Sequence, residues 1–516
     1  MFMTKFFQKD CRRWIAILLT AACFTMFSGC GGNPAMTPPE APSAPAPAPA
    51  PAPDPTAGTE DTDTAVSEAY VIPDTGPVSL WVVTEASVSD GMDHQIRSVI
   101  SAFAEEYPHI SIRLDILPVD EAERAAYLEE LKVKISQGSG PDVYLLPTSN
   151  LLVTEKPREY SYYKVQPLFP SVDMAMRGGY FLDIRELYDS DGGIGKEALQ
   201  QTVMEAGTVG ESRYVLPLRY NVPCLFVFDE ALEKTGISGD PGAFSIDDWM
   251  TWAVDSGDPA LARGTEYISM HAFSAEMDYG ERKVALAPEQ LASFMELFQK
   301  LEALVGTEMT QRYRRSLVDY CEDRWMPIPV QIGTMESGLF YAAVARAEGK
   351  TLSVYPVRTV EGDTVATVSY YGAVGANCAA PEAAYGFLRL FLTEEYQWEL
   401  SRPQPASHQY EGLVEGSWPI RVKGSAAPLW ANYFLQTKEQ CRTAKAITIG
   451  KLSIDDTAIP ALDWEIDIVR FPIDNGIDTL LLGLNDFADG NAPIEVDFME
   501  LASDYIEQLG ERFFPQ

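Results

Sequence analysis

Residues 78–150 read VSLWVVTEASVSDGMDHQIRSVISAFAEEYPHISIRLDILPVDEAERAAYLEELKVKISQGSGPDVYLLPTSN, and this stretch decides the fold. Its hydrophobic residues alternate between the period of a strand and the period of a helix, which predicts strands at 78–83, 110–116 and 143–146. Pro108 and Gly138 end the two helices between them. Helices of this length between strands predict parallel crossovers.

The same arrangement predicts where a ligand would bind. In an open parallel sheet, ligands bind beyond the carboxyl ends of the strands. Thr84 and Glu85 follow the first strand, whereas Thr148, Ser149 and Asn150 follow the third. We therefore expect polar ligand contacts at these two strand ends.

Length and charge narrow the class of protein. A chain of 516 residues is long for one core, so two or more lobes are expected. Acidic residues number 75 against 39 basic ones, a net charge of −36. Such a charge repels nucleic acid and anionic lipid and is compatible with a neutral or cationic ligand. The four histidines lack metal-ligand spacing, and no P-loop, GxSxG or GxGxxG motif is present, so the sequence indicates neither an enzyme nor a cofactor or metal.

Residues 1–29 predict an export signal rather than part of the fold. Four basic residues precede an apolar run at 14–27, which is too short for a comfortable membrane span. Residues 27–31, FSGCG, resemble a bacterial lipobox, and the resemblance implies that Cys30 is lipidated and becomes the mature N-terminus. The alternative is an ordinary signal peptide with a chance cysteine.

Residues 30–76 are expected to be a linker behind this cysteine. The alternating Ala and Pro at 41–53 cannot form a core and favour an extended chain of roughly 3.1 Å per residue. Four further cysteines follow, and they could pair in three ways or remain buried thiols: Cys224, Cys321, Cys378 and Cys441.

The rest of the chain continues the pattern of strands and helices. Residues 151–176 look irregular, and Asp189 to Gly193 reads as a polar turn because it lacks the carboxylates of a calcium loop. Residues 401–470 give no clear pattern. Strands are expected at 214–218, 222–228, 327–332, 352–357 and 365–371, the last closed by Gly372, and helices at 291–301, 334–348, 387–392 and 493–509.

Several stretches carry a resemblance to a known family through their order and spacing: 103–108 (FAEEYP), 136–143 (SQGSGPDV), 214–217 with 228–229, 244–249 and 383–397. Together they resemble the extracellular solute-binding proteins of ABC importers, the group that includes maltose-binding protein. The resemblance implies an α/β, two-lobed periplasmic-binding-protein-like fold with a hinge and an interlobe cleft. It implies that residues 77–219 and 332–373 form lobe 1, and that 220–331 and 374–516 form lobe 2.

The same resemblance implies a function. The chain would be a monomeric, lipid-anchored protein on the extracellular face of the cell membrane, would close around a small solute such as an oligosaccharide, and would deliver it to the ABC permease. It implies no catalysis, no cofactor, no metal and no nucleic-acid partner. Two alternatives stay open: a surface enzyme that acts on glycans, and a binding lipoprotein that serves a sensor kinase.

Ligand contacts are also carried over by position. Some of these residues have equally ordinary structural explanations: Glu85 as a charge at a helix N-terminus, Ser149 and Asn150 as helix caps, and Trp430 as a core residue. Of Tyr370 and Tyr371, one should face the cleft and the other the core, because side chains alternate along a strand. The full set of expected contacts is Thr84, Glu85, Ser149, Asn150, Tyr220, Asn221, Trp325, Glu336, Tyr370, Tyr371 and Trp430.

Overall fold

The computed structural model describes most of the chain after the linker. The chain divides into two units, 1–65 and 66–516, and every described residue lies in the second. The export signal, Cys30 and most of the linker therefore lie outside this part. No helix in it is both long and apolar enough to cross a membrane. The described residues are 70–85, 90–118, 120–148, 151–156, 159–164, 166–229, 232–233, 236, 239–266, 272–312, 328–331, 352–393, 396–397, 418–419, 465–473, 476–477, 480–481 and 496–515.

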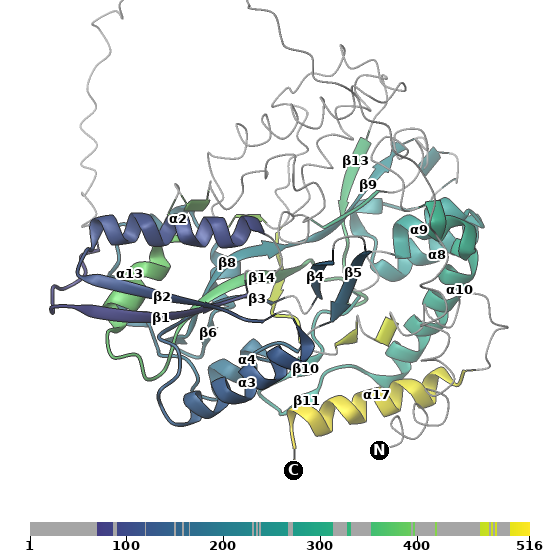
Figure 1. Cartoon of the computed structure of the whole chain (residues 1–516). Helices are drawn as coiled ribbons and strands as arrows, with labels where there is room; N and C mark the ends of the chain where they lie inside the picture. Colours follow the sequence, from purple (N-terminus) through teal and green to yellow (C-terminus); the bar gives the residue numbers. More distant parts are fainter. Residues whose placement is uncertain are drawn as a thin grey trace, which may run out of the picture. The chain divides into compact units, whose positions relative to one another are not determined.

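A mixed sheet forms the centre of the first lobe (Figure 1). Its strand order is β15-β8-β14-β3-β1-β2, and β16 pairs with β14. Strand β1 lies between β2 and β3 and runs parallel to both, as the sequence predicted, whereas β14 runs antiparallel to β3 and β8. The strands are β1 (Val78–Thr84), β2 (Ile110–Ile116), β3 (Val143–Pro147), β8 (Val215–Asn221), β14 (Val365–Val374), β15 (Trp418–Pro419) and β16 (Ile468–Arg470).

Helices α2 (Asp90–Glu106) and α3 (Glu121–Ser136) lie on opposite sides of this sheet (Figure 1). Asp120 caps α3 by accepting hydrogen bonds from the backbone of its first turn, and Gly138 leaves the helix with φ of 73°. These two helices and the three parallel strands confirm the predicted strand-helix-strand-helix-strand order.

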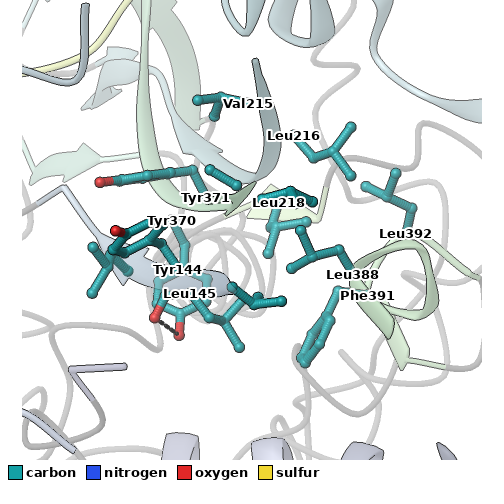
Figure 2. Close-up of a cluster of buried hydrophobic side chains, with 14 of the residues drawn as sticks. Tyr144, Leu145, Val215, Leu216, Leu218, Tyr370, Tyr371, Leu388, Phe391 and Leu392 are labelled. Atoms are coloured by element: carbon teal, nitrogen blue, oxygen red, sulfur yellow. Dashed lines mark hydrogen bonds between the residues drawn. The ribbon is translucent and has the colours of Figure 1, made fainter. Parts of the chain in front are cut away.

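Helix α13 (Pro381–Leu390) completes the core of the first lobe. Figure 2 shows Leu388, Phe391 and Leu392 gathered with Leu216 and Leu218 of β8. All five side chains are fully buried. Their burial removes a large apolar area from water, which is the main favourable contribution to folding.

A second, smaller sheet has its own core. Its order is β12-β9-β13, and all pairs are antiparallel. The fully buried Trp249 lies in this core, and a capping box between Ser245 and Asp248 starts its helix. The elements are β9 (Pro223–Phe228), β12 (Ile328–Gln331), β13 (Leu352–Pro356), α8 (Ile246–Ser256), α9 (Pro259–Glu266), α10 (Pro288–Arg312) and α17 (Phe498–Phe513).

Three crossings between the lobes can be followed within the described residues. Strand β8 ends at Asn221 and β9 begins at Pro223, so one residue separates the two sheets. Residues 357–364 lead from β13 back to β14, and residues 471–473 follow β16, beyond which Ile477 lies in the second core. The fold is thus two-lobed α/β with several short crossings between the lobes, the arrangement that hinge closure uses.

The remaining elements are short. Residues 151–176, expected to be irregular, contain a hairpin and a short helix. The hairpins are β4–β5 (Leu151–Lys156, Glu159–Lys164), β6–β7 (Thr208–Val209, Ser212–Arg213) and β10–β11 (Met277–Asp278, Lys283–Val284), and the helices are α4 (Val172–Arg177), α5 (Arg185–Ser190), η2 (Lys196–Ala198), α6 (Gln201–Glu205) and η3 (Pro241–Ala243).

The predicted lobe boundaries need corrections in both directions. The prediction puts β13 in lobe 1, but this strand pairs with β9 of the second sheet. It puts α13, β15 and β16 in lobe 2, but α13 packs in the core of the first lobe and the two strands pair in its sheet. Hydrophobic period identifies a strand or a helix, but it does not say which of two cores will bury it.

Three element ends also differ from prediction. Strand β14 continues past Gly372 to Val374, because the glycine leaves room for Leu388: a Cβ there would lie 2.7 Å from its Cδ2. The last helix begins at Phe498 rather than near Pro493, since Asp497 is its cap. Residues 219–221 belong to β8 rather than to a connection. The helix expected at 334–348 lies outside the described residues.

Candidate functional site

A pocket opens at the edge of the first sheet where β1 and β3 end. The empty space among its lining atoms is about 360 Å³ with open solvent included, and the enclosed part has room for roughly one water molecule. Because β1 and β3 are parallel neighbours, their carboxyl ends meet here, at the edge where the sequence predicted a ligand. The lining residues are Glu85, Leu146, Pro147, Thr148, Pro167, Leu168, Phe169, Val172, Tyr371 and Pro472.

Glu85 gives the pocket a carboxylate that is 6% exposed. Its Oε1 accepts a hydrogen bond of 2.5 Å from Nη2 of Arg124, which is 2% exposed. Its Oε2 has no hydrogen-bond partner among the described residues. A hydrogen bond to Oε2 is therefore available to a ligand that enters the pocket.

The pKa of Glu85 reflects two opposing effects. Burial raises this pKa and is the larger effect, whereas the adjacent Arg124 guanidinium lowers it. The alternative in which Glu85 acts as a charge at a helix N-terminus receives no support, because its ion pair is with α3 and α2 begins only at Asp90.

Tyr371 and Tyr370 are adjacent in β14 and have different surroundings. Both are 2% exposed, and Figure 2 shows them together at the edge of the first core. Tyr371 lines the pocket, and its hydroxyl has no hydrogen-bond partner among the described residues. The hydroxyl of Tyr370 instead donates to the Leu145 carbonyl at 3.2 Å and lies 3.3 Å from the Thr84 hydroxyl.

Thr84 ends β1 and Thr148 follows β3, and the hydroxyl of each donates a hydrogen bond to a backbone carbonyl. Thr84 is fully buried and donates to the Leu145 carbonyl at 2.7 Å, so its expected role as a ligand contact is replaced by a structural one. Thr148 lines the pocket, but its hydroxyl donates to the Val368 carbonyl.

Part of the pocket lining is apolar and aromatic. Phe169 packs edge-to-face against Tyr144, Tyr180 and Phe181, which fixes its ring at the pocket. Such a wall suits the apolar face of a ring, whereas Glu85 and Tyr371 suit polar groups at its edge. The pocket thus brings polar groups and an apolar wall together.

The other expected contacts lie elsewhere. Tyr220 and Asn221 are at the end of β8, where β15 and β14 pair with them, and neither lines this pocket. Asn221 does sit at the crossing into the second sheet, as expected. Ser149, Asn150, Trp325, Glu336 and Trp430 lie outside the described residues, as do Cys321 and Cys441.

Sequence reasoning missed Arg124, although the sequence holds a signal for it. Arg124, Leu128 and Leu131 are the buried residues of α3 and recur at i, i+4 and i+7. A basic residue on the apolar stripe of a helix needs a buried partner. Phe169 and Pro472 gave no comparable signal, because the chain segments that carry them have no regular period.

No cluster of three or more His, Cys, Asp or Glu side chains in the described part could hold a metal ion. Asp191 of the polar turn is fully buried and accepts hydrogen bonds from Arg389, Tyr385 and Gly193. Its oxygens are thus used within the fold. Cys224 is buried and Cys378 half-buried, and neither forms a disulfide with a described residue.

The sequence matches no family model and no curated protein, so its likeness to known proteins is one of structure. The chain is similar to an extracellular solute-binding protein of family 1 from Alicyclobacillus acidocaldarius, with 14% identity, a TM-score of 0.46, and 85% of this chain and 100% of that chain covered.

Two further solved structures show a similar level of likeness. A periplasmic oligogalacturonide-binding protein from Yersinia enterocolitica is 13% identical, with a TM-score of 0.47 over 84% of this chain and 98% of that one. A de novo designed cysteine esterase is 14% identical, with a TM-score of 0.49 over 85% and 98%. These scores lie below 0.5, so the assignment of a two-lobed α/β binding fold rests on the strand topology and the pocket of this chain.

Proposed function

We propose that this protein is a lipid-anchored, extracellular substrate-binding protein that closes around a small neutral solute, an oligosaccharide, and delivers it to an ABC permease. The observation that carries the proposal is the pocket at the end of β1 and β3. It combines a carboxylate oxygen and a tyrosine hydroxyl, neither hydrogen-bonded to a described residue, with an aromatic wall.

Hinge closure is the activity in this proposal. Residues 167–169 and 172 of the first lobe and Pro472 of a crossing line the same pocket. A ligand that contacts both stabilises one arrangement of the crossings over another by its differential affinity. No bond is made or broken, and the permease would recognise the closed arrangement.

The lipid anchor rests on the sequence alone. Residues 27–31 resemble a lipobox, and the Ala-Pro linker would hold the binding part away from the membrane. Mass spectrometry of the membrane-extracted protein tests this: acyl chains on Cys30 are expected. An unmodified N-terminus cleaved elsewhere would contradict it.

The binding function is tested by thermal denaturation against a panel of neutral oligosaccharides, uronate oligomers, peptides and polyamines. We expect stabilisation by at least one neutral sugar, and a weaker stabilisation in Glu85→Gln, whose amide oxygen can still accept a hydrogen bond but carries no charge. Stabilisation only by peptides or polyamines would overturn the sugar assignment. Release of shorter products from an incubated glycan would favour the enzyme alternative instead.

A further inference from the structure

Arg124 connects three segments, two of which supply residues that line the pocket. Its Nη2 donates to Glu85 at the end of β1, its Nε donates to the Gln166 carbonyl at 2.7 Å, and its Nη1 donates to the Pro118 carbonyl at 3.1 Å. Gln166 precedes the apolar pocket wall, and Pro118 follows β2. The guanidinium is 2% exposed, so its geometry is fixed by these three acceptors.

The ion pair also sets the charge of the pocket. The positive charge of Arg124 offsets the negative charge of Glu85, and both are buried away from screening water. What remains for a ligand is one acceptor, Oε2 of Glu85, in a pocket that Tyr371 also lines. A sugar hydroxyl matches this pair, because it can donate to the carboxylate and accept from the tyrosine.

Charged ligand groups fit less well. An ammonium group would bring an uncompensated buried charge to a carboxylate that is already neutralised. An ionised carboxylate on the ligand can only accept hydrogen bonds, and so can Oε2 of Glu85. The two groups would therefore face each other with no hydrogen between them. The net charge of −36 would by itself attract cations, so discrimination against amines has to be local.

We propose that Arg124 determines the charge selectivity of this pocket, and that through Arg124 the pocket selects an uncharged hydroxyl-bearing group over an amine or a carboxylate. This inference rests on the proposed binding function. It makes Arg124 a positioning residue for Glu85, and it assigns neutral sugars, rather than amino sugars or uronates, as the ligand class.

Two variants distinguish the effect of the pocket's charge on selectivity from the effect of damage to the fold. Arg124→Met leaves Glu85 with an unbalanced charge. The double variant Arg124→Met with Glu85→Gln loses the same arginine hydrogen bonds but restores neutrality. Arg124→Met should be the less stable of the two, because it leaves a buried charge uncompensated. Both variants are therefore titrated at a temperature at which each is folded, so that a difference between them in selectivity reports charge and not damage to the fold.

The measurement is a calorimetric titration at pH 7 with three matched probe pairs: glucose and glucosamine, galactose and galactosamine, and mannose and mannosamine. The wild-type protein should bind at least one neutral sugar more tightly than its amine. In Arg124→Met the ratio of the two affinities should shift toward the amine by on the order of tenfold, the difference between a neutral and a charge-assisted hydrogen bond. The double variant should lose this shift.

Each other outcome has a distinct meaning. Binding of a neutral sugar with an unchanged affinity ratio in Arg124→Met would overturn the role of Arg124 and leave the binding function intact. A wild-type preference for the amines would overturn the assigned ligand class. If the wild-type protein binds none of the six probes and no sugar of the thermal panel, the proposed function fails and this inference fails with it.

Discussion

The hydroxyl of Ser171 lies 2.7 Å from the hydroxyl of Tyr279. Ser171 caps α4 in the first lobe and adjoins the pocket residue Val172, whereas Tyr279 follows β10, whose hairpin packs with α17 of the second lobe. Arg177 of α4 also lies over the Tyr279 ring at 5.5 Å. The pocket wall and the second lobe are thus in contact through a few side chains, which is the type of contact that hinge opening would break.

Removing the Tyr279 hydroxyl tests this contact. Tyr279→Phe should weaken sugar binding roughly three- to tenfold, because about 0.5–1.5 kcal/mol of closed-state stabilisation is lost. The measurement is calorimetric titration with the sugar found in the thermal panel. Tyr505→Phe is the matched control: its hydroxyl bonds Glu276 within the second lobe, so stability should fall while affinity stays the same. Equal affinity losses in both variants would contradict the account.

Asp173 of α4 provides a pH-dependent test. Burial raises its pKa to about 6, whereas Arg177 acts in the opposite direction, and Tyr279 is the other titratable group beside it. Because the pKa of Asp173 in the folded protein exceeds its ordinary value, the protonated carboxyl contributes to the stability of the fold. This contribution is fully present below about pH 4 and is lost as the pH rises through 6. Relative to Asp173→Asn, the wild-type protein should lose on the order of 1–2 kcal/mol between pH 4 and pH 8.

Urea unfolding of both proteins across this range measures that difference. Asp247→Asn is the control for a carboxyl whose pKa is also raised to about 6, by burial and by Asp248, but which lies in α8. The difference in stability between the wild-type protein and Asp247→Asn should depend on pH in a similar way. The sugar affinity of Asp247→Asn should equal that of the wild-type protein at every pH. A pH-independent difference between wild-type and Asp173→Asn would show that Asp173 titrates normally.

Substitutions of Tyr370 and Tyr371 should distinguish an effect on stability from an effect on sugar affinity. Tyr370→Phe removes a buried hydrogen bond to Leu145 and should cost about 1 kcal/mol of stability with little effect on affinity. Tyr371→Phe removes a hydroxyl without a described partner, so stability should hold while affinity falls at least several-fold. Urea unfolding and calorimetry on the two variants check this pair, and the reverse pattern would place the ligand elsewhere.

Substitution of Asp191 tests whether the polar turn at 189–193 has a structural role rather than binding a cation. Asp191→Ala leaves the Arg389 side chain, which is 13% exposed, without its carboxylate and should cost about 3–5 kcal/mol. Asp189→Ala, beside it, breaks an exposed pair with Arg185 and should cost less than about 1 kcal/mol. Calcium or EDTA should leave the midpoint of thermal unfolding unchanged in the wild-type protein. A rise in that midpoint with calcium would restore the cation-loop explanation.

The sequence predicted the first lobe well because its elements have clean periods. The strands around Leu80, Ile112 and Leu145 and the helices between them follow from spacing alone, and parallel pairing follows from helix length. Parallel pairing in turn predicts that Glu85 and Thr148 lie at the same edge of the sheet, where both line the pocket.

The errors came from contacts between residues that are distant in the sequence. Nothing near Leu352 says that it pairs with Phe228 in the second sheet, and nothing near Leu388 says that it packs against the first. Thr84 looked like a ligand contact because its buried acceptor, the carbonyl of Leu145, is 61 residues away. Arg124 was overlooked because it lies in a highly charged helix where one more basic residue is unremarkable.

The central claim is that the two lobes close around a small neutral solute. Small-angle X-ray scattering of the purified protein, with and without a saturating concentration of the sugar found in the thermal panel, tests it most directly. Closure predicts a smaller radius of gyration with sugar, and no decrease for Tyr371→Phe at a concentration that it does not bind. Saturable binding with an unchanged radius of gyration would contradict closure, and so would a decrease of equal size when a non-binding sugar is added.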